Sequence, residues 1–184
     1  MSKLISARSL EEIFRSNRAE GAPPEVDAER FRRVFAGCSH RRPVNPAVAR
    51  VYIRERQMPE EARFLEVLDQ AAKFHDLEIR GFHFDIGKSG MSLMGLPALV
   101  SLLELCREGE VGIVVVRDTA RLGRGGGYLP VVDLLRKLQI RLLDLSCGEF
   151  VDLDPRATLL TSSVGRARRS VWFSSKTAAS RQPS

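Results

Sequence analysis

Between Val48 and Leu145 the sequence alternates short apolar segments with longer segments whose apolar residues recur at helical spacing. One apolar segment, VGIVVV, is a continuous run bounded by charge, which is typical of a strand buried inside a parallel sheet. The alternation predicts an α/β fold, in which a mostly parallel sheet carries helices on both faces. The predicted strands are Val48–Ile53, Leu77–Phe84, Val111–Val116 and Ile140–Leu145, and the predicted helices are Pro59–Phe74, Leu96–Arg107 and Leu129–Leu138.

The segments outside this alternation divide the chain into three predicted parts. Residues 1–46 form a short helical extension that ends in a polar linker, residues 47–169 form the α/β domain, and residues 170–184 form a basic tail. In the extension, Ser9-Leu-Glu-Glu12 has the pattern of a capping box, which predicts a helix that ends near Ala19. A second helix is predicted over Asp27–Phe35, where the apolar residues share one face. The basic tail is either disordered and solvated or in contact with nucleic acid.

Composition limits the classes of function. The 184 residues are 43% hydrophobic and 28% charged, which suits a globular domain. The net charge is +6, and residues 1–50 and 165–184 carry most of the positive charge, as in chains that contact nucleic acid through phosphates. No apolar run has membrane-spanning length, and the amino terminus does not resemble a signal peptide. We therefore expect a cytoplasmic protein with no membrane partner.

Cofactor and metal signals are weak. Three scattered cysteines do not form a disulfide framework, which favours a reducing compartment. Cys38-Ser39-His40 is followed by no second pair of ligands, so no metal is expected. The loop GRGGGY, residues 123–128, lacks the complete spacing of a nucleotide-binding motif, so no cofactor is expected.

Arginines follow two of the predicted strands at their carboxyl ends. Arg54 and Arg56 follow the first strand, Asp85 follows the second, and the loop after VGIVVV contains Arg117, Asp118, Arg121 and Arg124. Because the carboxyl ends of parallel strands meet at one edge of a sheet, these side chains should converge there. Several guanidiniums at one edge favour a phosphate ligand, and a carboxylate-rich protein partner is the alternative.

Three stretches, VYIRE, FDIGKSG and VVVRDTARLGRGGG, give the chain a resemblance to a known family. In this order and spacing they resemble the catalytic domain of serine site-specific recombinases, the resolvases and invertases, over roughly Val48 to Arg169. The resemblance implies a reaction in which a serine attacks a DNA phosphodiester and becomes linked to a 5′ end, with no metal or nucleotide. Arginines around that serine would neutralise the phosphate and stabilise charge in the transition state.

The resemblance assigns roles to some residues of this chain. It implies that Arg54, Arg121 and Arg124 bind the DNA phosphate, and that Asp85, Ser89 and Gly90 belong to the loop after the second strand. We expect the three arginines to form one cluster.

At three positions the chain departs from the family pattern. Arg56 stands where the nucleophilic serine belongs, Ala120 stands where the pattern has an acid, and Leu96 stands where it has an arginine. A guanidinium stays protonated and cannot act as a nucleophile, so no catalytic set is intact and DNA cleavage is expected to be lost. The prediction is a degenerate recombinase domain, for example a relic of a mobile element, that retains DNA phosphate binding or a role in assembly. The alternatives are an active recombinase whose nucleophile lies elsewhere and a protein-interaction domain that binds acidic partners.

The carboxyl-terminal segment resembles the start of the family's dimer-forming helix. Pro155 to Trp172 places Leu159, Leu160 and Val164 near one helical face, which predicts a weak homodimer. About twenty residues follow Val164, too few for a helix-turn-helix module, so DNA contact is expected to be non-specific and made through phosphates.

Overall fold

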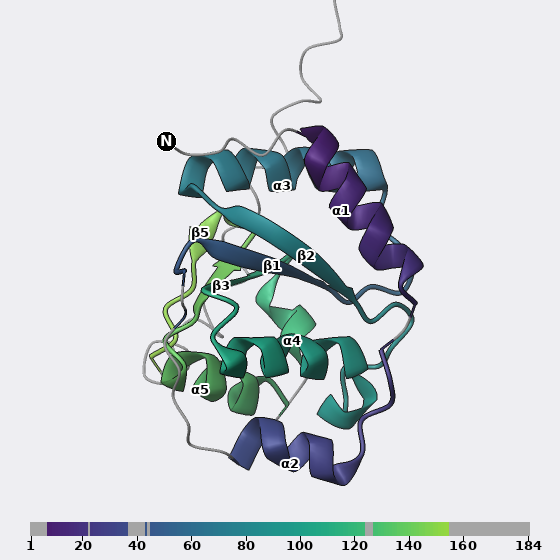
Figure 1. Ribbon diagram of the computed structural model, residues 1–184, viewed down its shortest axis with the longest axis vertical. Helices are drawn as coiled ribbons and strands as arrows, with labels where there is room; N and C mark the ends of the chain where they lie inside the picture. Colours follow the sequence, from purple (N-terminus) through teal and green to yellow (C-terminus); the bar gives the residue numbers. More distant parts are fainter. Residues whose placement is uncertain (1–6, 22, 37–42, 44, 124–126, 155–184) are drawn as a thin grey trace, which may run out of the picture.

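A computed structural model describes residues 7–21, 23–36, 43, 45–123 and 127–154 (Figure 1). The helices are α1 (Ala7–Ala19), α2 (Ala28–Ala36), α3 (Glu61–His75), α4 (Pro97–Glu108) and α5 (Tyr128–Lys137). The strands are β1 (Val48–Ile53), β2 (Glu78–Phe84), β3 (Ile113–Val116), β4 (Arg141–Asp144) and β5 (Glu149–Phe150), with 3₁₀ turns η1 (Leu93–Gly95) and η2 (Thr119–Leu122). The predicted helix and homodimer segment after Pro155, the basic tail and Arg124 lie outside the described residues.

The strands form one sheet in the order β2-β1-β3-β4-β5. The first four strands pair in parallel, and β5 pairs antiparallel with β4. This arrangement confirms the predicted α/β class with a mostly parallel sheet. The sequence did not predict β5, because a two-residue strand that follows a tight turn has no detectable periodicity. Gly148 makes that turn possible, since it adopts a positive φ of 72° and its N–H donates to the carbonyl of Asp144 at 2.8 Å.

Two apolar cores lie on opposite faces of the sheet, and alternate residues of a strand enter different cores. Val51 of β1 belongs to the core beneath α1 and α3, whereas its neighbour Tyr52 belongs to the core shared with α4 and α5. Figure 1 shows α1 and α3 on one side of the sheet and α4, α5 and α2 on the other. The helices therefore cover both faces, as predicted.

The first helix packs directly on the sheet. Phe14 is fully buried, and its ring makes edge contacts with Phe82 and Phe84 of β2 at centroid distances of 5.1 and 5.3 Å. The side-chain oxygen of Asn17 accepts a hydrogen bond from the backbone N–H of Phe82 at 2.8 Å, which satisfies an outward-facing donor on the edge strand. The helix begins at Ala7, so Ser9 lies inside it and the predicted capping box does not mark its start.

The second helix forms an outer layer on α4 (Figure 1). Asp27 caps it, since its carboxylate accepts a hydrogen bond from the backbone N–H of Arg30 at 2.6 Å. Arg30 in turn donates two hydrogen bonds to the carboxylate of Glu104 on α4, at 2.8 and 2.7 Å. Arg107 of α4 donates to backbone carbonyls near the end of α2. These contacts attach α2 to the domain through charge as well as through the buried Val34.

None of the helices in the described ranges is long and apolar enough to span a membrane.

The packing of α1 predicts that this helix contributes to the stability of the whole domain. We expect Phe14→Ala to lower the free energy of unfolding by about 3–5 kcal/mol, because it leaves a cavity against two aromatic rings. Ser16→Ala, on the exposed side of the same helix, should change it by less than about 0.5 kcal/mol. Urea unfolding measures both. A loss below about 1 kcal/mol for Phe14→Ala would show that α1 is docked only loosely.

Candidate functional site

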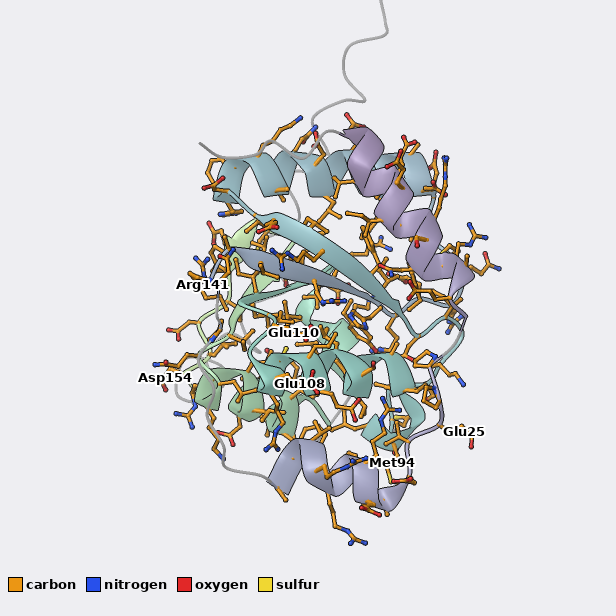
Figure 2. All side chains as sticks on the ribbon, viewed as in Figure 1. Glu25, Met94, Glu108, Glu110, Arg141 and Asp154 are labelled. Atoms are coloured by element: carbon orange, nitrogen blue, oxygen red, sulfur yellow. The ribbon has the colours of Figure 1, made fainter. Side chains whose placement is uncertain are left out.

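The carboxyl ends of the parallel strands lie at the same end of the sheet, which we call its carboxyl edge. In Figure 1 the arrows of β1 and β2 point to the right, and in the same view Figure 2 shows Met94 of η1 towards that side. Arg141, the first residue of β4, lies at the left, where the strands begin. The loops that follow β1, β2, β3 and β4 therefore share one edge, as the sequence predicts for a parallel sheet.

Arg54 follows β1 and is only 5% exposed. Its Nε donates to the backbone carbonyl of Arg121 at 2.7 Å, and its Nη2 donates to that of Ala120 at 2.5 Å. Gly90, in the loop after β2, packs so closely on this guanidinium that a Cβ there would lie 2.6 Å from Arg54 Cζ. Arg54 thus joins the loops after β1, β2 and β3, and much of its hydrogen-bonding capacity is used inside the protein.

Arg121 follows β3 and meets Arg54 at the same edge. Its Nη1 donates to the carbonyl of Arg54 at 3.3 Å, so the two arginines bond to each other's backbone. Its Nε pairs with a carboxylate oxygen of Asp118 at 2.9 Å, and its Nη1 also lies 3.1 Å from Glu55 Oε2. The other oxygen of Glu55 pairs with Arg117 at 3.0 Å. The edge is therefore a network in which two internal carboxylates partly balance the arginines.

Asp85 follows β2 and is 1% exposed. Its two carboxylate oxygens accept hydrogen bonds from the backbone N–H groups of Ala98 and Leu99, at the start of α4, and from the hydroxyl of Tyr52. Burial raises the pKa of Asp85, while these three hydrogen bonds act in the opposite direction. Burial and the neighbouring Asp85 raise the pKa of Tyr52 well above its usual value. Asp85 is thus placed to hold the first turn of α4 against the end of β1.

The three positions at which the sequence analysis expects a departure from the recombinase pattern have different surroundings. Arg56 is exposed, and no hydrogen bond or ion pair joins it to another described residue. Leu96 is fully buried in the core beneath α4. Ala120 is exposed, but its carbonyl accepts one of the hydrogen bonds of Arg54. Of the three, Arg56 is the one whose side chain is open to solvent in the loop that follows β1.

The other two residues expected at the site, Ser89 and Gly90, lie in the loop after β2. Ser89 is exposed, and its hydroxyl lies 3.4 Å from the backbone N–H of Met91, which is a long hydrogen bond within its own loop. Gly90 lies against Arg54, as described above. The structure thus brings Arg54, Arg121 and Gly90 together, whereas Ser89 points to solvent. Among the described residues, no group of three or more His, Cys, Asp or Glu side chains is placed to hold a metal ion.

Sequence reasoning missed two carboxylates of this edge. Glu55 is flanked by arginines, and the sequence does not show which cations its carboxylate bridges. Asp144 ends β4 and is 7% exposed; its carboxylate accepts hydrogen bonds from Ser146 and from the backbone N–H of Thr119. Burial raises the pKa of Asp144. An acid at the end of a buried strand was the available signal for Asp144, because such an acid must find donors at the sheet edge.

Two of the arginines at this edge keep part of their side-chain surface open to solvent. Arg117 and Arg121 keep 48% and 29% of their side-chain surface exposed, so a ligand from solvent can reach them. A guanidinium offers a planar fork of donors suited to phosphate. The side chain at position 56 offers another cation and no hydroxyl.

Comparison with known proteins places these observations in context. A family model described as the resolvase N-terminal domain matches residues 48–168. No curated protein matches the sequence significantly. The solved N-terminal catalytic domain of TP901-1 integrase is similar in structure, with a TM-score of 0.52 and 20% identity, covering 65% of this chain and 92% of that one. A resolvase family site-specific recombinase from Streptococcus pneumoniae gives a TM-score of 0.48 and 24% identity, covering 65% of this chain and 85% of that one.

The contact between Gly90 and Arg54 yields a stability prediction. We expect Gly90→Ala to cost about 1–3 kcal/mol of unfolding free energy, because the added methyl group overlaps a guanidinium that is fixed by two carbonyls. Gly95→Ala is the matched control, since a Cβ there meets no atom within 4 Å. Thermal or urea unfolding measures both variants. In an Arg54→Ala background the Gly90→Ala penalty should shrink, and an unchanged penalty would contradict the steric cause.

Proposed function

Because the chain belongs to the resolvase family of serine recombinases, we propose that it is a recombinase catalytic domain that no longer cleaves DNA and still holds DNA phosphates. The observation that carries the proposal is Arg56, a solvent-exposed arginine at the end of β1, where the family pattern has its nucleophilic serine. The recombinase class and the α/β fold are the premise. Loss of cleavage and retention of phosphate binding are the proposal.

Loss of cleavage follows from the chemistry of the side chain at position 56. Strand cleavage by this family needs a hydroxyl oxygen that bonds to phosphorus while the 3′ oxygen of the DNA leaves. A protonated guanidinium has no free electron pair for that step. Leu96 and Ala120 remove a further cation and an acid of the family pattern, so transition-state stabilisation should be weakened as well.

Retention of phosphate binding is supported by the other arginines. Arg117 and Arg121 are partly exposed at one edge, and Arg56 adds an exposed charge one residue after Glu55, which pairs with both of them. Arg124 lies outside the described residues, and its assignment rests on the RLGR motif alone. Arg54 contributes by fixing the backbone of Arg121, because its own guanidinium is buried against carbonyls. Homodimer formation through residues 155–172 is likewise proposed from the sequence alone.

The first test concerns covalent chemistry. We expect no protein–DNA adduct when the protein is incubated with nicked suicide substrates and resolved on a denaturing gel. Arg56→Ser should restore little or no adduct, because Leu96 and Ala120 remain. An active serine recombinase on its own site serves as the positive control. A serine-linked adduct with the wild-type protein would show that the nucleophile lies elsewhere and that the enzyme is active.

The second test concerns phosphate binding. The test is fluorescence anisotropy with a non-specific duplex. Arg121→Ala together with Arg124→Ala should weaken binding. The steepness of log K against log salt concentration should fall by about two, or about one for each lost phosphate contact. Arg136→Ala with Lys137→Ala is the matched control, since it removes the same charge from the last turn of α5. Circular dichroism should first confirm that the variants are folded.

If the edge variant and the control behave alike, the arginines do not form a DNA site. They would then be better explained as structural groups or as a surface for an acidic protein partner, and binding to such a partner would become the leading hypothesis.

A further inference from the structure

Glu55 lies between two cationic side chains at the candidate site. One carboxylate oxygen is 3.0 Å from Nη1 of Arg117, and the other is 3.1 Å from Nη1 of Arg121. The Glu55 side chain is 14% exposed, whereas both arginines face solvent more freely. A single carboxylate therefore bridges the two arginines that a DNA phosphate would reach first.

A carboxylate in this position resembles a bound phosphate in its contacts. Both groups are anionic and present several oxygens to guanidinium forks. Asp118 is a second internal anion at this site, because its carboxylate pairs with Nε of Arg121 at 2.9 Å. Of the donors that Arg121 would offer to DNA, Nε and Nη1 are thus already bonded within the protein.

From this geometry we infer that Glu55 is an internal competitor of the DNA phosphate and sets the affinity of the site by occupying Arg117 and Arg121 when DNA is absent. The inference rests on the proposed phosphate-binding function and adds a specific residue that limits it. When DNA binds, a phosphate oxygen replaces the carboxylate at Nη1 of at least one arginine, and the Glu55 side chain rotates away from it.

The surroundings of Glu55 allow such an exchange. Its backbone carbonyl accepts a hydrogen bond from the N–H of Gly87 at 2.7 Å, so the main chain is held independently of the side chain. Ion pairs that remain in contact with water are weak and readily exchanged, and Arg117 is about half exposed. A buried pair would instead resist exchange, because breaking it would strand a charge away from solvent.

The local charge also favours competition over a purely structural role. Arg117 and Arg121 are the two described arginines of this edge that pair with carboxylates, and those carboxylates are Glu55 and Asp118. The carboxylates of Asp85 and Asp144 are instead bonded to backbone N–H groups and hydroxyls. Removal of the Glu55 charge would make this edge more positive by one and would release Nη1 of Arg117 and weaken the hold on Arg121, whose Nε stays paired with Asp118. The attraction for a polyanion should increase accordingly.

The test is Glu55→Gln, which keeps the size of the side chain and removes its charge. With the 184-residue chain at low salt, we expect about three- to tenfold tighter binding to a short fluorescent duplex of arbitrary sequence, as estimated from the loss of two partly exposed ion pairs. The slope of log K against log salt should rise by about one to two, because two more arginines contact phosphate. Thermal unfolding should show that the variant is folded like the wild type.

Asp133→Asn is the matched control. Asp133 also bridges two cations, Arg136 at 2.8 Å and Lys137 at 2.7 Å, and its substitution changes the net charge by the same amount on α5. We expect this variant to change DNA affinity by less than about twofold, because the released cations lie away from the site. If both variants bound DNA more tightly to the same extent, the change in net charge alone would explain the effect, and the inference would be overturned.

A combined variant separates this inference from the proposed function. In an Arg117→Ala, Arg121→Ala background, Glu55→Gln should have no effect, since the cations it would release are absent. If the arginine variants weaken binding while Glu55→Gln leaves it unchanged, the inference fails and the proposed function stands. If neither the arginine variants nor Glu55→Gln alters binding, both fail.

Discussion

The carboxyl edge of the sheet depends on one buried guanidinium. Arg54 donates to the carbonyls of Ala120 and Arg121, and Gly90 closes over it, so three loops from three different strands are fixed by one side chain. Without these acceptors a buried cation would be strongly unfavourable, and without the cation the two carbonyls would lose their donors. The position of Arg121, and with it the network of Glu55 and Arg117, follows from this single arrangement.

Periodicity predicted much of the fold, because each main element buries an apolar face large enough to leave a pattern. Residues 48–53 form the first strand as predicted, and the long helices begin and end within one or two residues of the expected positions. The pattern failed where the deciding contacts are local and polar. β5 depends on a turn at Gly148, and the start of α1 is not set by the capping box at Ser9. The tight packing of α1 against Phe82 also could not be read from its sequence, since an amphipathic helix does not reveal which surface it will cover.

For the site, the sequence correctly predicted that Arg54 and Arg121 meet, but it did not predict how the charges are shared. The parallel topology alone brings Arg54 and Arg121 to one edge. Whether each guanidinium faces solvent, a carbonyl or a carboxylate depends on loop geometry within a few ångströms, and spacing along the chain carries no such information. This is why Arg54, expected to hold phosphate directly, is buried against backbone, and why the bridging carboxylate of Glu55 was not foreseen.

The proposed loss of the nucleophile fits a separation of structural and chemical roles in this fold. In the proposed assignment, position 56 is the one that faces the reacting phosphate, and its side chain supports no other part of the fold, since Arg56 is exposed and makes no hydrogen bond or ion pair with another described residue. Arg54 has the opposite character, since its loss would disturb three loops. Leu96 adds a barrier to reversal: it is fully buried in the core beneath α4, so an arginine there would carry its charge into an apolar interior. Under the proposed function, Arg56→Ser would therefore return a hydroxyl to the site, whereas an arginine at position 96 would require the core beneath α4 to repack.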